Sequence, residues 1–600
     1  MSRNIFATVF LLFIVFIGNA QTSVDPRLKG LDTFVNKILK DWHSAGVSIA
    51  VVEKNKIIFT GGFGYRDYEK KLPVTPTTLF AIGSCTKAFT GSLIGMLEKD
   101  GKVDFDKPVR NYLPELKFYN EYLNNHVTLR DMMCHRTGLP RHDYSWYGST
   151  ASRSELLARV EFQEPSAELR EKWQYNNFMF MAQGMVVEKI MNKSWEDVVT
   201  EKILKPLGMV NTTTSIAALE KSTDRSLAYS LKQDSIITVI PYRNIDAIGP
   251  AGSINSCSKD MANWLITWVN GGKFNGTEVI PAGYSAQATS SQMSMGGGTP
   301  SKENPDVFLS NYGFGWMISS YRGHMRIEHG GGIDGFITST GFFPSDSIGI
   351  FVVSSQGSVT TSIRNFIADR MLKLPYRNWS QQLLTAAKKG AADAKLLPNA
   401  DSITRKPGTK PSHSLGDYTG SFENKGYGQV KIFQERDTIW MDYNEGGKRT
   451  SSYLQHHHYD VFRIRSTEES GENKDAPKVR FNSNTSGDIV SLEAQLEPSV
   501  KDIIFEKMAP TLVLGKKDLE KYTGDYSLSS LTVKVYIRGE NTLMVLVPGQ
   551  PDYELVPTKK DEFNLKTLKG YSVRFDTNDK NETTALSFVQ PNGIFTAKKK

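Results

Sequence analysis

Ser84-Cys85-Thr86-Lys87 is the stretch on which the interpretation of this sequence depends. Apolar residues recur at helical spacing after it and Asp100-Gly101 ends that pattern, so we expect a helix that starts near Ser84. Side chains at positions i and i+3 of a helix share a face, which lets the Lys87 amine reach the Ser84 hydroxyl. A serine hydroxyl becomes a good nucleophile only when a base removes its proton. Alone, the stretch also fits a capping serine followed by a surface lysine.

Two further motifs give the first one more weight. Tyr175-Asn176-Asn177 is a Y-x-N pattern, whose first and third side chains point the same way in an extended segment. His329-Gly330-Gly331-Gly332 follows an expected strand in which Met325 and Ile327 share a face with His329. The three motifs together indicate one site built from distant segments of the chain.

In their order and rough spacing, these motifs resemble those of the β-lactamase-related serine hydrolases. That family includes class C β-lactamases, D-alanyl-D-alanine carboxypeptidases, D-aminopeptidases and some esterases. The resemblance covers about residues 28–374. The stretches that support it are His135-Arg136-Thr137-Gly138-Leu139-Pro140, Ala251-Gly252-Ser253-Ile254 and Gly313-Phe314-Gly315-Trp316.

The resemblance implies a role for each residue of the motifs. Ser84 would attack a carbonyl carbon and form an acyl-enzyme. Lys87 and Tyr175 would share the proton transfer, and either of them could be the base. Asn177 would orient the substrate amide or the lysine. The backbone N–H groups of Ser84 and Gly332 would form the oxyanion hole.

His329 departs from the lysine that class C β-lactamases carry at the start of the third motif. A lysine there is a fixed cation for a substrate carboxylate, whereas an ordinary histidine is only partly charged near neutral pH. The family's peptidases on D-amino-acid substrates use histidine, so we expect a peptidase or amidase of the D-aminopeptidase or D-Ala-D-Ala carboxypeptidase type. Gly330 and Gly331 would let the backbone approach the substrate closely. His329 is therefore counted among the candidate catalytic residues, with a purely structural histidine on a strand as the alternative.

Two other functions are the alternatives to a peptidase. The first is a carboxylesterase or weak class C-type β-lactamase that uses the same acyl-enzyme. The second is a non-catalytic binding or scaffold protein that kept the fold, and the three intact motifs argue against it. Cys85, beside the expected nucleophile, is a rival nucleophile, but the surrounding motifs are those of a serine enzyme. We expect a small peptide, amide or ester as substrate.

No metal or organic cofactor is expected from the sequence. The three cysteines, Cys85, Cys134 and Cys257, are too few for a disulfide scaffold and show no C-x-x-C spacing. His456-His457-His458 has no acidic or histidine cluster nearby that would complete a metal site, and adjacent histidines on a strand point to opposite faces. We interpret these histidines as a solvated strand end.

The fold class expected is α/β (α+β). Strand patterns lie at both ends of residues 28–374, and helical or loop-rich sequence dominates from about Leu129 to Leu265. This order predicts a β-lactamase-like antiparallel sheet with flanking helices and a helical lobe. The expected strands are Val47–Val52, Lys56–Thr60, Met325–His329, Gly335–Phe343 and Ile348–Ser354.

Composition changes after the hydrolase-like region. Residues 375–411 are rich in proline, glycine and charge and are expected to be a linker that holds one short amphipathic stretch, Trp379–Lys388. Beyond it the eight residues that begin at Leu415 resemble those that begin at Leu519, which indicates an internal repeat, with chance similarity between two β domains as the alternative. Short alternating strands follow each copy, so two small antiparallel β-barrels that resemble lipocalins are expected at 412–508 and 512–600. They could shape access to the site or support a homo-oligomer.

The first twenty residues predict export from the cytoplasm. Arg3 precedes an apolar stretch, Ile5 to Ile17, which small residues follow up to Ala20, as in a signal peptide over residues 1–20. That stretch is shorter than a membrane span, so the mature protein is expected to be secreted, periplasmic or in the cell envelope, without an integral membrane segment. A net charge of +8 among 72 basic and 64 acidic residues, without basic stripes interleaved with aromatics, argues against nucleic-acid binding.

Overall fold

A computed structural model describes most of the chain from residue 25 to residue 600. The signal peptide expected at residues 1–20 lies outside the described residues. Among the helices described, none combines the length and the apolar character that a bilayer crossing requires. The internal stretches left out of the description are 298–299, 303–304, 307–308, 356–358, 397–404, 444–451, 467–475, 510–513, 540, 569–570 and 591.

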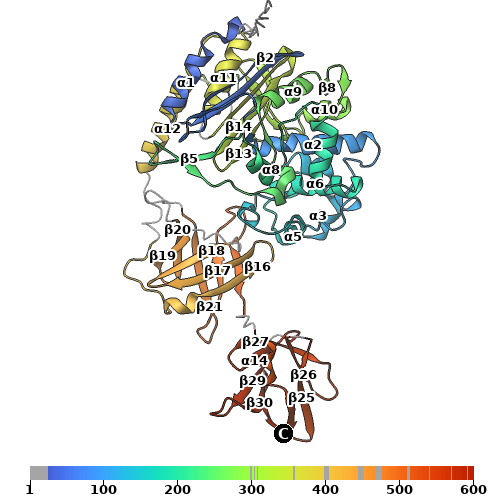
Figure 1. Ribbon diagram of the computed structural model, residues 1–600, viewed down its shortest axis with the longest axis vertical. Coiled ribbons are helices and arrows are strands. Elements are labelled where there is room, and N and C mark those ends of the chain that lie inside the picture. The colour runs from blue at the N-terminus through green and yellow to red at the C-terminus, as the bar shows by residue number, and fades with distance from the viewer. Residues whose placement is uncertain are drawn as a thin grey trace, which may run out of the picture. The chain divides into compact units, whose positions relative to one another are not determined.

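An antiparallel sheet forms the centre of the region that resembles the serine hydrolases, as the sequence predicts (Figure 1). Its strands come from both ends of the region, because β1 pairs with β15 on one side and with β2 on the other. Over the described residues the strand order is β10-β11-β12-β13-β14-β15-β1-β2-β3. The bounds are β1 Gly46–Glu53, β2 Lys56–Asp67, β3 Leu72–Pro73, β10 Met293–Ser294, β11 Ser310–Tyr312, β12 Met317–Tyr321, β13 His324–Ile333, β14 Phe336–Phe343 and β15 Ile348–Ser354.

Helices cover both faces of this sheet, which explains why β1 and β15 are almost continuously apolar. Alternate residues of β1, such as Ile49 and Val51, pack in one core with α1 and α11. On the opposite face Val52 lies beside Gly349 and near Leu265 of α9. The helices of this region are α1 Leu31–Asp41, α2 Lys87–Lys99, α3 Glu121–His126, α4 Leu129–Met133, α6 Asn177–Met191, α7 Trp195–Val199, α8 Ile216–Lys221, α9 Ser258–Val269, α10 Ala282–Ala288, α11 Val359–Met371 and α12 Trp379–Leu396.

The C-terminal part contains two closed antiparallel barrels of eight described strands each. Each barrel has its own apolar core, around Tyr418 and Phe505 in the first and around Tyr522 and Phe563 in the second. The strands of the first are β16 Gly420–Asn424, β17 Gly428–Glu435, β18 Thr438–Tyr443, β19 Ser452–His458, β20 Val461–Ser466, β21 Lys478–Ser483, β22 Ile489–Ala494 and β23 Ile503–Lys507. Those of the second are β24 Gly524–Leu528, β25 Leu531–Arg538, β26 Thr542–Leu546, β27 Tyr553–Lys559, β28 Glu562–Leu565, β29 Ser572–Thr577, β30 Thr583–Gln590 and β31 Gly593–Lys599.

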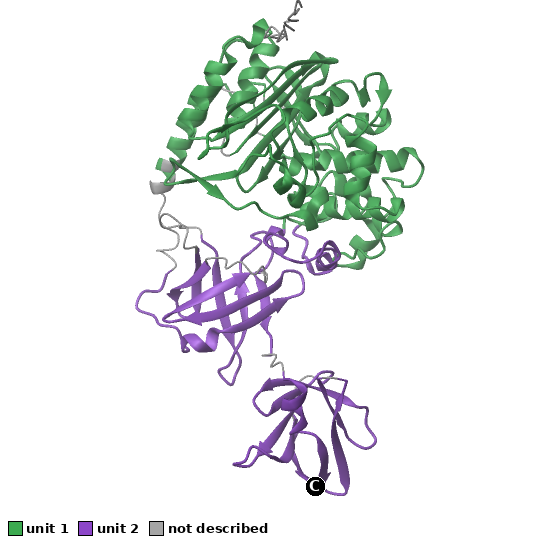
Figure 2. Cartoon of the chain, in the orientation of Figure 1, with its two compact units in different colours: residues 1–141, 167–396 green, residues 142–166, 397–600 purple. Residues whose placement is uncertain are grey.

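The chain divides into two compact units, each made of two stretches that are separate in the sequence (Figure 2). One holds residues 1–141 and 167–396, and the other holds residues 142–166 and 397–600. Two features differ from the boundaries expected from composition. Residues 142–166, with α5 (Arg153–Arg159), group with the barrels. The expected linker contains α12, whose Trp379 packs against the core formed by α1, α11 and the sheet.

Candidate active site

Ser84 lies in a tight turn that leads directly into α2. The 3-10 helix η2 (Gly83–Thr86) precedes α2, and the Lys87 amide donates to the Ser84 carbonyl. The Ile82 amide donates to the Ile254 carbonyl at 3.0 Å, which ties the start of the turn to the stretch that begins at Ala251. The turn therefore presents Ser84 at the beginning of a buried helix, as the sequence predicts.

The Ser84 hydroxyl oxygen accepts two hydrogen bonds from the residues that the motifs single out. The Lys87 Nζ donates to it at 3.1 Å, and the Tyr175 hydroxyl donates to it at 2.6 Å. Both donors can also carry the proton that leaves Ser84 during nucleophilic attack. The geometry thus brings the first and second motifs into direct contact.

Lys87 is fully buried and holds the site together. Its Nζ donates to Asn177 Oδ1 and to the Ala251 carbonyl, both at 2.8 Å, besides Ser84. Asn177 is the first residue of α6 and not part of an extended segment, because the Asn176 side chain caps the helix by accepting from the Met179 amide. The Y-x-N motif still places both of its outer side chains at the site.

Aromatic rings pack against Tyr175. His135 lies 4.4 Å from the Tyr175 ring centroid, and its Nδ1 accepts from the Asn176 amide at 3.2 Å. Burial, followed by the Lys87 cation, keeps the pKa of His135 well below its usual value. Trp173 lies 6.0 Å from Tyr175, between centroids. These neighbours restrict the Tyr175 ring, and neutral His135 adds no positive charge beside it.

The glycines of the third motif bring β13 against the Ser84 turn. β13 does not end at His329 but continues to Ile333. A Cβ on Gly331 would lie 1.9 Å from the Ile82 carbonyl oxygen, and one on Gly83 would lie 2.9 Å from the Gly332 amide nitrogen. Only glycine permits this approach, so the backbone amides expected to form the oxyanion hole belong to two segments in direct contact.

At position 330, unlike position 331, the surrounding space does not require a glycine. The nearest atom to a Cβ at this position would be the Thr338 carbonyl oxygen, at 3.6 Å, which is an ordinary contact. Its carbonyl instead accepts a hydrogen bond from His329. Its assignment as a substrate-binding residue stays a prediction.

His329 is buried and neutral, which corrects the expectation of partial charge. Its side chain donates from Nδ1 to the Gly330 carbonyl at 2.6 Å, so Nε2 of the neutral ring accepts from the Tyr312 hydroxyl at 2.8 Å. Burial, followed by the Lys87 cation, lowers the pKa of His329 to about 4. A carboxylate anchor at this position would need a protonated ring, and desolvation prevents it.

Cys85 does not have the properties of a nucleophile. Its thiol is buried and donates to the His329 carbonyl at 3.2 Å. Burial raises the pKa of the thiol to about 12. Reactive cysteines are thiolates near neutral pH, so this residue instead links the Ser84 turn to β13.

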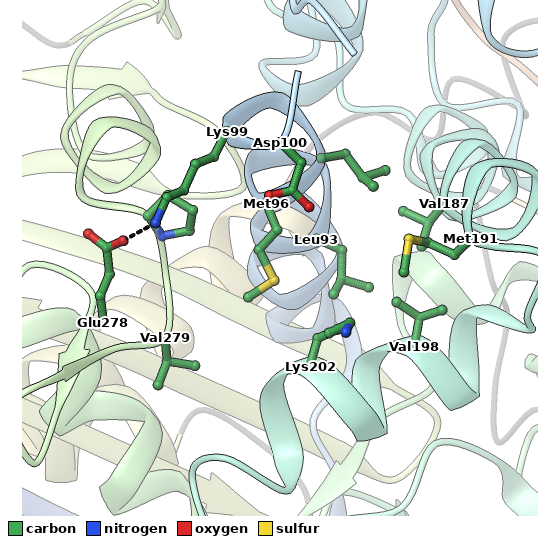
Figure 3. A pocket seen from close by; sticks show the side chains of 12 residues that line it. Leu93, Met96, Lys99, Asp100, Val187, Met191, Val198, Lys202, Glu278 and Val279 are labelled. Carbon is green, nitrogen blue, oxygen red and sulfur yellow. Dashed lines mark hydrogen bonds and ion pairs between the residues drawn. The ribbon is translucent and has the colours of Figure 1, made fainter. Parts of the chain in front are cut away.

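The described residues hold no group of three or more histidine, cysteine or acidic side chains suited to a metal ion. His457 is buried at 4% exposure in β19, so the solvated strand end expected for the three histidines is wrong for this residue. A pocket of about 230 Å³ lies between the C-terminal parts of α2 and α6, lined by Leu93, Met96 and Met191 among others (Figure 3). It contains none of the candidate catalytic residues.

The chain belongs to the β-lactamase family, whose members are serine hydrolases. The family model described as Beta-lactamase matches residues 31–369, which is more than half of the chain. A second model, for a domain of unknown function named DUF3471, matches residues 404–507 and includes the first barrel. The motifs thus lie in one family domain, and the described site is part of it.

Three relatives illustrate how far the similarity extends. Unguisins hydrolase ungD' of Aspergillus campestris is 30% identical over 459 residues, which are 71% of this chain and 82% of that protein. Protein flp of Staphylococcus aureus is 25% identical over 332 residues, which are 55% of this chain and 63% of that protein. The solved structure of the octameric penicillin-binding protein homologue from Pyrococcus abyssi has a TM-score of 0.51 at 20% identity, covering 79% of this chain and 99% of that one.

Three contributors to the site were not assigned roles from the sequence. The Ala251 carbonyl binds Lys87, His135 packs on Tyr175, and Tyr312 binds His329. Two of them lie in stretches that support the family resemblance, and Tyr312 directly precedes the third such stretch. Those stretches could have indicated their proximity to the site, but not which atom makes the contact.

Burial of His329 predicts an acid-sensitive hydrolase unit. An unfolded histidine titrates near 6.5, and His329 titrates near 4, so between these values the unfolded chain binds a proton that the native protein does not. Stability should therefore fall as the pH falls from 6.5 to 4, and His329 alone should account for about 3 kcal/mol of the fall. Urea unfolding at a series of pH values should give a shallower slope for His329→Gln.

Burial also lowers the pKa of His135, so the stability of His329→Gln should still fall to some extent as the pH falls. The matched control is His126→Gln, which removes an exposed imidazole. A slope in His329→Gln equal to that of the wild type would contradict the assignment of a neutral His329.

Proposed function

We propose that this protein hydrolyses peptides or amides, including those with D-residues, through an acyl-enzyme on Ser84. The observation that carries the proposal is the position of the Ser84 hydroxyl oxygen, which accepts from both Lys87 Nζ and the Tyr175 hydroxyl. A nucleophile with two proton-carrying partners within 3.1 Å is the arrangement that acyl transfer requires.

The reaction would proceed in two steps. Ser84 Oγ attacks the carbonyl carbon while its proton passes to whichever of Tyr175 and Lys87 has first lost its own proton, as a phenolate or a neutral amine. The amides of Ser84 and Gly332 stabilise the negative charge on the carbonyl oxygen. The same proton then goes to the leaving nitrogen as the C–N bond breaks, which leaves an ester on Ser84. Water, deprotonated by the same pair, hydrolyses that ester and returns the proton to Ser84.

Because His329 is neutral, we favour substrates that need no cation at this position of the site. A fixed positive charge would favour substrates with a carboxylate, as in the β-lactamases that carry lysine there. Neutral peptides and amides do not need that anchor, and the relative described as an unguisins hydrolase supports a hydrolytic activity. A carboxylesterase with the same acyl-enzyme is the second candidate, favoured by the same absence of charge on His329.

Export is also proposed, and it rests on the N-terminal sequence. The basic residue, apolar stretch and small residues of positions 1–20 support cleavage by a signal peptidase. A substrate outside the cytoplasm would follow from it.

The first test distinguishes Ser84 from its neighbour. Ser84→Ala should abolish labelling by a fluorophosphonate probe and lower turnover by roughly 10³–10⁶-fold, because the nucleophile is lost. Cys85→Ala removes the buried thiol next to Ser84, which is a similarly small change in side-chain size. This variant should still be labelled on Ser84. Intact-mass measurement after labelling checks both. Labelling that survives Ser84→Ala and disappears in Cys85→Ala would overturn the proposal.

The second test concerns the two candidate bases. Lys87 and Tyr175 act on one proton, so their losses should be strongly non-additive. Lys87→Ala combined with Tyr175→Phe should have a labelling rate close to that of the poorer single variant. Stopped-flow labelling of the four proteins measures this, and additive losses would mean that the residues act on different steps.

The third test concerns substrate charge. Because His329 stays neutral, a peptide with a free carboxylate and its amide should give parallel profiles of kcat/KM between pH 5.5 and pH 8. A chromogenic cephalosporin, which carries a carboxylate, should be turned over more slowly than a neutral peptide amide. An inflection near pH 6.5 that occurs only with the free carboxylate would instead make His329 a charged anchor.

A further inference from the structure

Residues 142–166, called the insert below, belong to the unit that contains the barrels, although family similarity places them inside the hydrolase domain (Figure 2). His142 is buried and its Nε2 donates to the Glu164 carbonyl at 2.9 Å. Its Nδ1 therefore accepts from the Tyr427 hydroxyl, at 2.6 Å. The His142 amide donates to Glu497 Oε2 at 3.1 Å. Side chains of the first barrel thus satisfy both the backbone and the ring of His142.

Further contacts hold the rest of the insert to the same part of the first barrel. The Ser145 hydroxyl donates to the Gly426 carbonyl at 2.6 Å, and Ser145 is fully buried. Phe162 lies under Lys425, whose Nζ is 5.4 Å from the ring centroid. These residues of the barrel form the turn between β16 and β17. Buried polar groups satisfied in this way are costly to separate, so the insert and the first barrel should behave as one body.

Both ends of the insert continue into segments that carry the active site. The segment before it, 135–141, and the segment after it, 167–177, are joined by backbone bonds from Arg170 to Arg136, at 2.7 Å, and from Gln174 to His135, at 2.8 Å. The buried carboxylate of Asp131 binds both Arg136 and Arg170. The returning segment then reaches Tyr175 and the start of α6.

Arg141 is the last residue before the insert, and its guanidinium lies beside Tyr175. The guanidinium carbon is 4.8 Å from the Tyr175 ring centroid, and Lys87 Nζ is 4.7 Å from the same centroid. A cation over an aromatic ring orients the ring, and it also disfavours additional positive charge nearby. Arg141 should therefore favour the deprotonated form of the base, whether that base is Tyr175 or Lys87.

We propose that the first barrel positions Arg141 for catalysis by holding the adjacent His142. Arg141 acts as a positioning residue through Tyr175 and does not itself react. The bond between Tyr427 and His142 fixes the backbone from which the Arg141 side chain extends. This inference rests on the proposed acyl-enzyme, because its effect is exerted on the proton transfer from Ser84.

The test is the rate of Ser84 labelling by a fluorophosphonate as a function of pH. Arg141→Met should move the acid limb of the profile to higher pH by about 0.4–0.7 unit, the shift that an exposed cation–π contact supports. Arg141→Lys keeps the charge, so the acid limb of its profile should lie close to that of the wild type. Tyr427→Phe removes one hydroxyl of the barrel and should move the limb in the same direction as Arg141→Met. Combining it with Arg141→Met should add little, because both act through one contact.

The matched control is Tyr526→Phe. It removes an equally buried hydroxyl, which donates to the Tyr522 carbonyl at 2.7 Å in the second barrel. Its pH profile should equal that of the wild type. Ser145→Ala breaks the hydrogen bond from the insert to the Gly426 carbonyl, and it replaces Tyr427→Phe if thermal unfolding shows that variant to be unfolded.

Each outcome is decisive for one of the two proposals. Absence of labelling in the wild type would overturn the proposed function itself. Labelling with a wild-type profile in both Tyr427→Phe and Ser145→Ala, beside a shifted Arg141→Met, would overturn the role of the barrel. A uniform loss of rate at every pH, without movement of the limb, would reduce the contact to a structural one and also overturn the inference.

Discussion

The buried amine of Lys87 is the interaction on which the geometry of the hydrolase unit depends. It is fully enclosed and donates to three oxygens, on Ser84, Asn177 and Ala251, that come from separate parts of the chain. An amine buried without such acceptors would be strongly unfavourable, so its burial requires that the turn before α2, the start of α6 and the loop at Ala251 converge. Stability and chemistry are therefore linked in one side chain, and its loss removes one hydrogen bond from each of three oxygens.

The five main strands of the sheet could be predicted from the sequence, because they are regular and bounded by turns, whereas the short strands β3, β10 and β11 and the strand β12 were not expected. The strand at Ile348–Ser354 has the limits expected from its apolar run, and the first hairpin pairs as expected. The strand now labelled β13 was expected to stop at His329, and three glycines follow it in the sequence. Glycine inside a strand weakens it in general. It continues through them because the Ser84 turn needs a backbone without side chains beside it. A Cβ on Gly331 would lie only 1.9 Å from the Ile82 carbonyl oxygen.

The electrostatic state of the site could be predicted only in part. The identity of the motif residues indicated which groups meet, and the described distances agree with that for Ser84, Lys87, Tyr175 and Asn177. The charge of His329 depends instead on desolvation and on Tyr312, which reaches it from another strand. A motif specifies the residue but not how much water surrounds it, so the shift could not be derived from spacing.

The contact between His142 and Tyr427 joins residues 285 positions apart in the sequence. At a synthesis rate of about 5–20 residues per second, the insert leaves the ribosome roughly 15–60 s before its partner exists. During that interval Nδ1 of His142 lacks its hydrogen-bond donor from the barrel, and the segment that leads to Tyr175 is not held at its start. If the first barrel positions Arg141 as proposed, a nascent or truncated chain that lacks this barrel carries every residue of the three motifs but not the restraint on His142. The final pH dependence of its nucleophile is then reached only after the first barrel has folded.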